Sequence, residues 1–169
     1  MTFSPELETR FAKMLAQYPQ GRQRSAVIPM LIYAQDEVGA ITPELIAEVA
    51  TRCGVQPLQV DEVVGYYSML HRKPQGKYHV QVCTNISCML RGAYDLYERF
   101  QDELGIGHKG VTSDGVFSLE EVECIGACCW APAIQVNYDF LDDLTPDSVP
   151  EILGKYRSAA KATGEASHA

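Results

Sequence analysis

Four of the six cysteines form two spaced pairs, and thiolates arranged in this way are typical metal ligands. Four residues separate Cys83 from Cys88, three separate Cys124 from Cys128, and 35 residues lie between the pairs. Iron–sulfur clusters are usually held by four cysteines, whereas structural zinc sites more often use a C-x2-C turn. Because each iron of a two-iron cluster takes its own pair of sulfurs, these wider loops favour a [2Fe–2S] cluster over zinc. Disulfides and unrelated thiols remain alternatives.

Cys129 provides an alternative ligand, because its distance in sequence from Cys124 equals that of the first pair. Its neighbour Trp130 predicts a packed, partly apolar environment, in which Cys129 would be a small buried or oxidisable thiol. Cys53 lies within a predicted helix and is expected in a core. The sequence contains no Cys-x-His pair typical of a Rieske site and no C-x2-C dithiol typical of thioredoxin-type oxidoreductases.

The other ionisable residues show no catalytic pattern. His71, His79 and His108 are isolated in the sequence and are expected at the surface or at a domain interface. The acidic runs Glu120-Glu121-x-Glu123 and Asp142-Asp143 are expected to be solvated. The sequence therefore predicts no catalytic residue of its own.

The composition excludes several classes of function. The 169 residues carry a net charge of −8 and no basic cluster, which argues against nucleic-acid binding. No apolar run approaches the roughly 20 residues of a membrane span. The segment from Met1 to Glu8 has neither the apolar core of a signal peptide nor the arginines of a transit peptide. We therefore expect reduced cysteines and a cytoplasmic location, either free or on the cytoplasmic face of a larger assembly.

Helices and strands must position the cysteines. In the first 73 residues the sequence predicts helices only. Ser4-Pro5 and Thr42-Pro43 are typical helix starts. Gly39 and Gly54 are typical helix ends. Apolar residues at helical spacing predict four helices, beginning near residues 5, 25, 42 and 57, that share a small core.

The pattern changes after the boundary at Pro74-Gln75-Gly76. Tyr78, Val80 and Val82 alternate with polar residues, which predicts a strand over 77–83 that ends at the first cysteine. The remaining predicted elements are a helix over 87–104, strands over 116–122 and 133–136, a short strand within 137–143, and a helix over 145–156.

This order of elements predicts an α+β protein in which a thioredoxin-like domain follows a helical bundle. The predicted domains are residues 1–73, which are helical, and 74–157, which carry the cysteines. The small polar residues of 158–169 predict a disordered tail.

With these residues in view, the chain resembles the 24-kDa subunit family of respiratory complex I (NADH:quinone oxidoreductase), whose members are thioredoxin-like [2Fe–2S] ferredoxins. The resemblance extends from Tyr18-Pro19 to about Leu153. The Cys129-Trp130 pair departs from it, because the family has other, non-ligand residues there. The motifs that carry the resemblance are Ser25-Ala26-Val27-Ile28-Pro29, Val63-x2-Tyr66-Tyr67-Ser68-Met69, Pro74-x-Gly76-Lys77-Tyr78-x4-Cys83, Glu123-Cys124-Ile125-Gly126-Ala127-Cys128-x2-Ala131-Pro132 and Leu144-Thr145-Pro146.

The resemblance implies an electron carrier with one [2Fe–2S] cluster bound by Cys83, Cys88, Cys124 and Cys128. It also implies a partner, the larger flavoprotein subunit that binds NADH and FMN, together with other subunits of the peripheral arm on the cytoplasmic face of the inner membrane. The helical domain would dock that partner. The chain itself has no G-x-G-x-x-G fingerprint for binding a dinucleotide.

Three alternatives remain open. The same module occurs in NAD-linked hydrogenases and formate dehydrogenases, where it serves as the equivalent diaphorase subunit. A zinc-stabilised interaction module is an alternative from a different class, and it would be colourless with one zinc per chain. A redox-sensing thiol protein would instead show a reversible disulfide and no metal.

Overall fold

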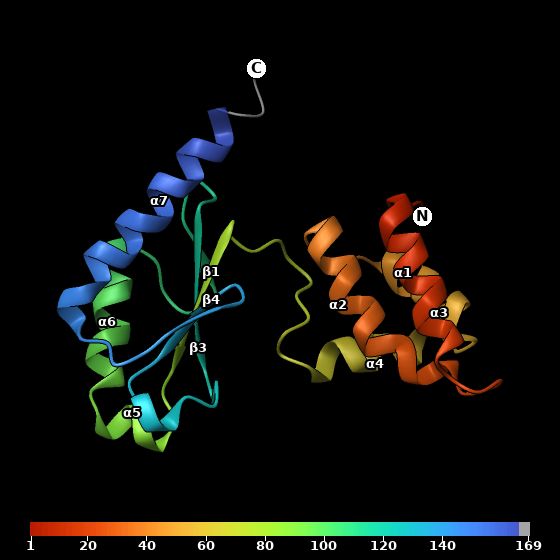
Figure 1. Ribbon diagram of the computed structural model, residues 1–169, viewed down its shortest axis with the longest axis horizontal. Helices are drawn as coiled ribbons and strands as arrows, with labels where there is room; N and C mark the ends of the chain where they lie inside the picture. Colours follow the sequence, from red (N-terminus) through yellow and green to blue (C-terminus); the bar gives the residue numbers. More distant parts are fainter. Residues whose placement is uncertain (166–169) are drawn as a thin grey trace. The chain divides into compact units, whose positions relative to one another are not determined.

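We describe a computed structural model of the protein, covering residues 1–165 (Figure 1). The chain divides into two compact units, Met1–Pro74 and the remainder from Gln75 onward. The division falls one residue later than the sequence analysis predicts.

The first unit consists of helices, as expected. Ser4 and Thr42 cap two of them, since each side-chain oxygen accepts a hydrogen bond from a backbone N–H of the first turn at 3.2 Å. Gly39 and Gly54 end two helices in the left-handed conformation that glycine adopts without strain. The elements are α1 (Pro5–Ala16), the 3-10 helix η1 (Gln23–Ala26), α2 (Val27–Val38), α3 (Pro43–Cys53) and α4 (Pro57–Tyr66).

The core of the helical unit contains the apolar faces of all four α-helices. Cys53 belongs to it, as predicted, and its sulfur lies 3.5 Å from that of Met30. On the rim of this core, Arg52 donates two hydrogen bonds to Glu8 and one to Glu48. Both acidic side chains have a lowered pKa, because the guanidinium favours their charged forms.

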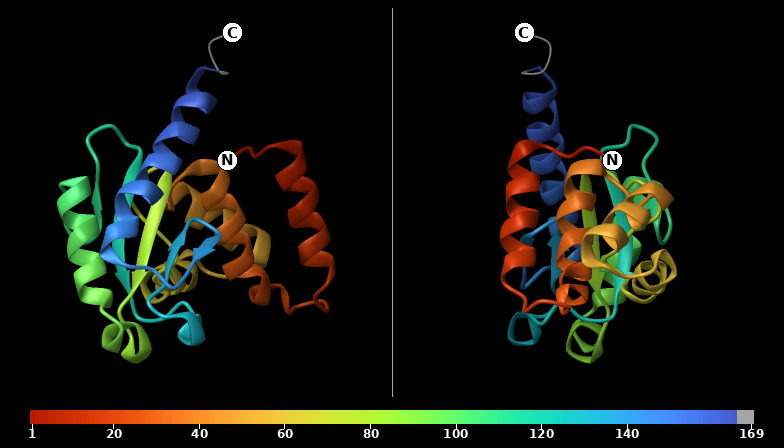
Figure 2. Two further views of the ribbon diagram at one scale, coloured as in Figure 1. Left: turned by 60° about the vertical axis from the view of Figure 1, so that its left-hand side comes forward. Right: turned by 90° about the vertical axis from the view of Figure 1, so that its right-hand side faces the viewer.

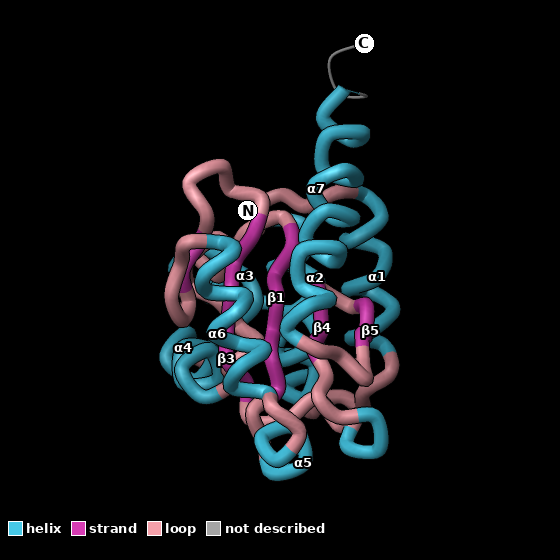
Figure 3. Tube along the Cα trace, turned by 90° about the vertical axis from the view of Figure 1, so that its left-hand side faces the viewer, coloured by secondary structure: helices cyan, strands magenta, loops and turns pink. Residues whose placement is uncertain are grey.

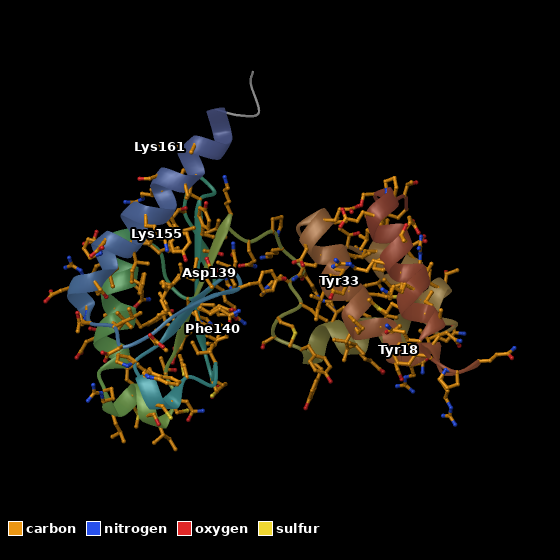
Figure 4. All side chains as sticks on the ribbon, viewed as in Figure 1. Tyr18, Tyr33, Asp139, Phe140, Lys155 and Lys161 are labelled. Carbon is orange, nitrogen blue, oxygen red and sulfur yellow. The ribbon has the colours of Figure 1, made fainter. Side chains whose placement is uncertain are left out.

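The second unit is built on a five-stranded sheet with the order β2-β3-β1-β4-β5 (Figure 3). Strands β1 and β3 are parallel, and the other neighbours are antiparallel. Strand β5 forms one edge, where the labelled Phe140 is exposed (Figure 4). The strands are β1 (Tyr78–Cys83), β2 (Gly110–Val111), β3 (Phe117–Val122), β4 (Ile134–Val136) and β5 (Asp139–Leu141).

Helices α6 and α7 cover one face of this sheet (Figures 2 and 3). Val80 and Val82 point to that face because side chains alternate along a strand, and they pack with Leu96, Phe100 and Leu153 of the two helices. The helical elements are α5 (Ile86–Leu90), α6 (Ala93–Leu104), η2 (Cys128–Trp130), η3 (Pro146–Ser148) and α7 (Val149–Glu165).

Three sequence predictions for this unit need correction. The single helix expected over 87–104 is two helices, because Gly92 adopts a left-handed conformation with φ of 89°. The short strand β2 was not expected. The predicted disordered tail is helical as far as Glu165, since α7 continues through an alanine-rich segment with high helix propensity. Residues 166–169 of that prediction lie outside the described residues.

The topology brings the ends of two strands together. Because β1 and β3 are parallel neighbours, their carboxyl ends meet at the same edge of the sheet, with Cys83 opposite Val122. Cys83 at the end of β1 and the segments that follow these two strands provide all four predicted ligands.

Candidate metal centre

The first pair of cysteines is buried. Cys83 is the last residue of β1, and Cys88 lies on the short helix α5, which starts after a hydrogen bond from the Ile86 N–H to the Asn85 side chain. Both cysteines are less than 4% exposed. Both also belong to one buried cluster of side chains. The fold therefore packs these two predicted ligands in the same cluster.

The environment of Cys88 disfavours a free thiolate. Burial raises the pKa of its thiol to about 11, and the hydrogen bond with Cys83 and the charges of Cys83 and Cys128 act in the same direction. A hydrogen bond from the Ala133 backbone opposes this shift. Thiolates are the form that binds metal, so a cationic centre here would offset the shift by stabilising the charged sulfurs.

The second pair lies in the loop between β3 and β4, which contains η2. Gly126 has a φ of 81°, in the left-handed region that glycine adopts without strain. Its N–H lies 3.3 Å from the sulfur of Cys124 and donates a hydrogen bond to it. Cys128 begins η2, and both cysteines are exposed. This loop therefore presents two accessible sulfurs, and the sulfur of Cys124 accepts a hydrogen bond from a backbone N–H.

The two cysteine loops pack against each other. Ala131 is buried in one cluster with Cys83 and Cys88, and Ile125 packs against it. Helix α5 contacts η2, and both lie at the same end of the unit (Figures 1 and 2). The bond between Ala131 and Pro132, just before β4, is cis.

The donors at this site suit an iron–sulfur cluster by their chemistry. Cys83 and Cys88 pack in one buried cluster, α5 contacts η2, which begins at Cys128, and thiolates are the ligands that such clusters use. Cys124 lies in the same loop as Cys128. Within residues 1–165, no three His, Cys, Asp or Glu side chains are grouped closely enough to surround a single metal ion.

Cys129 and Trp130 differ from the prediction. A packed, partly apolar environment was expected, but Trp130 is 62% exposed and Cys129 is exposed as well. The prediction was wrong because these residues form a single 3-10 turn at the surface. The role of Cys129 as a non-ligand stays a prediction.

Glu120 also differs, since it is buried rather than solvated. Glu120 and Ser118 lie on the same face of β3, opposite α6 and α7. The two ring nitrogens of His79 on β1 make hydrogen bonds with these two side chains. Lys109 adds an ion pair at 3.6 Å. The acidic run in the sequence gave no sign of this group of interacting side chains, because its members come from separate strands and loops.

Two residues that were not predicted from the sequence tie the first cysteine loop to other segments. Arg91 follows α5 and donates a hydrogen bond to the Ala131 carbonyl. Thr84 follows Cys83 and donates one to the side chain of Glu121 on β3. Their nearness in sequence to Cys83 and Cys88 was the available signal.

Comparison with protein families identifies the class. The model of the thioredoxin-like [2Fe–2S] ferredoxin family matches residues 11–157, and the chain belongs to this family. The family implies one [2Fe–2S] cluster and confirms the predicted α+β fold, in which a thioredoxin-like domain follows helices.

Two relatives are named as subunits of one kind of enzyme. The chain is 47% identical over 131 residues to NADH-quinone oxidoreductase subunit 2 of Thermus thermophilus, covering 78% of this chain and 70% of the relative. It is 38% identical over 152 residues to an NADH-quinone oxidoreductase subunit from Mycobacterium tuberculosis. That match covers 90% of this chain but spans only 60% of the mycobacterial protein.

A solved structure shares the fold. An NAD⁺-reducing [NiFe]-hydrogenase chain superposes with a TM-score of 0.68 at 16% identity, over 79% of this chain and 23% of that one. At this level of identity the likeness shows the fold alone. No helix in the described part of the chain is long and apolar enough to cross a membrane.

Proposed function

We propose that this chain is the electron-transfer subunit of an NADH:quinone oxidoreductase and carries one [2Fe–2S] cluster on Cys83, Cys88, Cys124 and Cys128. The observation that carries the proposal is the burial of Cys83 and Cys88 in one cluster, next to the contact between α5 and η2, which begins at Cys128, in a chain of the ferredoxin family. The relatives named as subunits of that enzyme support the assignment to this complex.

The chain's own residues have a limited set of tasks in this function. Cys83 and Cys88 hold one side of the site away from water, because both are buried. Cys124 and Cys128 hold the exposed side, and the Gly126 N–H stabilises negative charge on the Cys124 sulfur. The bound cluster supplies one-electron transfer. The chain is thus a carrier, and dehydrogenase activity belongs to the assembly.

The partner in this proposal is the flavoprotein subunit that binds NADH and FMN, within a peripheral arm on the cytoplasmic face of the membrane. Apolar side chains near the cysteines support a docked partner, since Ile86, Leu90 and Trp130 are between 62% and 75% exposed. Large exposed apolar groups commonly mark interaction sites. The helical domain offers a second such surface at Leu58 and Tyr66 of α4, which supports its role in docking.

The shared fold favours one second candidate, the diaphorase subunit of an NAD-linked hydrogenase. Both candidates require the same cluster and a flavin partner. They differ in the acceptor of the electrons, so copurification with a quinone-reducing or a hydrogen-oxidising complex distinguishes them.

The proposal predicts that a charge on the apolar surface slows electron exchange with the flavoprotein. In Leu90→Glu, burial of an unpaired carboxylate at the contact should weaken binding to the flavoprotein roughly tenfold or more. The measurement is the NADH-driven reduction of the bound cluster in a stopped-flow mixture of the two purified subunits.

Val111→Glu is the matched control, because Val111 is also exposed but lies on the edge strand β2. It should leave the rate unchanged. Equal rates for Leu90→Glu and the unsubstituted chain would contradict docking at this surface.

A further inference from the structure

We propose that Arg91 is a positioning residue that joins the two cysteine loops and raises the reduction potential of the centre between them. The inference rests on the proposed function, because it takes the four cysteines as ligands. Arg91 follows directly after α5, and its backbone N–H donates a hydrogen bond to the carbonyl of Cys88 at 3.1 Å. Its backbone is therefore fixed to the first loop.

The side chain of Arg91 reaches the second loop. Its Nε donates a hydrogen bond to the carbonyl of Ala131 at 3.4 Å, three residues beyond Cys128. Ala131 is itself buried against Cys83 and Cys88. Arg91 thus spans the contact between the loops, and the planar guanidinium suits this task because it offers several donors in fixed directions.

A third segment completes the connection. An Nη of Arg91 lies 3.9 Å from a carboxylate oxygen of Asp143, and the Asp143 N–H donates a hydrogen bond to the carbonyl of Trp130 at 2.8 Å. Asp143 has a φ of 49°, an uncommon conformation that the surrounding contacts hold in place. The segment after β5 is therefore tied both to Arg91 and to the second cysteine loop.

Electrostatics determines whether the charge of Arg91 raises or lowers the reduction potential of the centre. A centre bound by four thiolates gains negative charge on reduction, in a protein that already carries a net charge of −8. A nearby positive charge favours the reduced state, and Asp143 partly opposes it. The Arg91 side chain is 63% exposed, so the effect should be moderate and should weaken with salt.

The test uses the full chain with its cluster assembled, in four variants. Arg91→Gln removes the charge, Arg91→Lys keeps the charge but loses the guanidinium, and Asp143→Asn removes the opposing charge. Arg99→Gln is the control, because Arg99 lies on α6 and pairs with Glu103. The measurements are the midpoint potential by redox titration at low salt, and the rate at which a chelator removes iron.

For Arg91→Gln we expect the ratio of reduced to oxidised protein at fixed potential to fall about threefold to tenfold. That change corresponds to a midpoint about 28 to 59 mV more negative. Iron should also leave roughly threefold faster or more. Arg91→Lys should keep the potential but lose iron faster, Asp143→Asn should raise the potential, and Arg99→Gln should change neither.

A potential of Arg91→Gln equal to that of Arg99→Gln, or an unchanged rate of iron loss, would overturn the proposal. So would a failure of lysine to restore the potential. A chain without substitutions that assembles no iron and sulfide would instead overturn the proposed function, and the two failures are therefore distinct.

Discussion

Replacing Cys124 with serine is expected to abolish the [2Fe–2S] cluster or to change its spectrum strongly. Serine offers a hard oxygen of high pKa where the cluster requires a soft thiolate. In this chain the Cys124 sulfur already accepts a hydrogen bond from the Gly126 N–H, so the loop supplies a donor to the sulfur at this position. The measurement is the visible and EPR spectrum of the reduced protein, together with its iron content.

Cys129→Ser is the matched control, because Cys129 is exposed in the same segment and lies next to Cys128. Its iron content and spectrum should equal those of the unsubstituted chain. If Cys129→Ser loses the cluster while Cys124→Ser or Cys128→Ser keeps it, the ligand assignment is wrong and Cys129 belongs to the set.

The second large effect is expected at Gly76, which leads into β1. A Cβ at this position would lie 2.5 Å from the backbone nitrogen of Ser118 and 2.7 Å from the carbonyl oxygen of Phe117. These atoms belong to β3 and cannot rotate away, so the start of β1 would have to move. Gly76→Ala should lower the free energy of unfolding by about 2–4 kcal/mol. Urea denaturation monitored by circular dichroism measures this change.

Gly154→Ala provides the control in the same unit. Gly154 lies in α7, and no atom lies within 4 Å of the position that its Cβ would take. Alanine should stabilise the helix by about 0.5–1 kcal/mol. Equal stabilities of the two variants would show that the close approach of Gly76 to β3 does not constrain the fold.

The main features of the fold were predictable because they depend on local patterns. Ser4-Pro5 and Thr42-Pro43 marked helix starts through capping, and the alternation from Tyr78 to Val82 marked the central strand. The break at Gly92 was missed, since apolar residues on both sides of it continue the helical spacing. Strand β2 was missed because two residues are too short to form a pattern.

The site was predictable in its donors but not in its surroundings. The spacing of the cysteines indicated a cluster, because ligand pairs close along the chain are visible in the sequence. Which side chains connect the loops depends on contacts between distant segments, and Arg91 reaches Ala131 across 40 residues. The burial of Glu120 likewise depends on His79, which lies 41 residues away in the chain.

The most direct test of this account is the iron and acid-labile sulfide content of the anaerobically purified chain, with EPR spectra before and after reduction. We predict about two irons and two sulfides per chain, no signal in the oxidised state, and a spin-half signal on reduction, as expected of a [2Fe–2S] cluster on four cysteines. Zinc without sulfide, and no EPR signal in either state, would contradict electron transfer and indicate a structural zinc module.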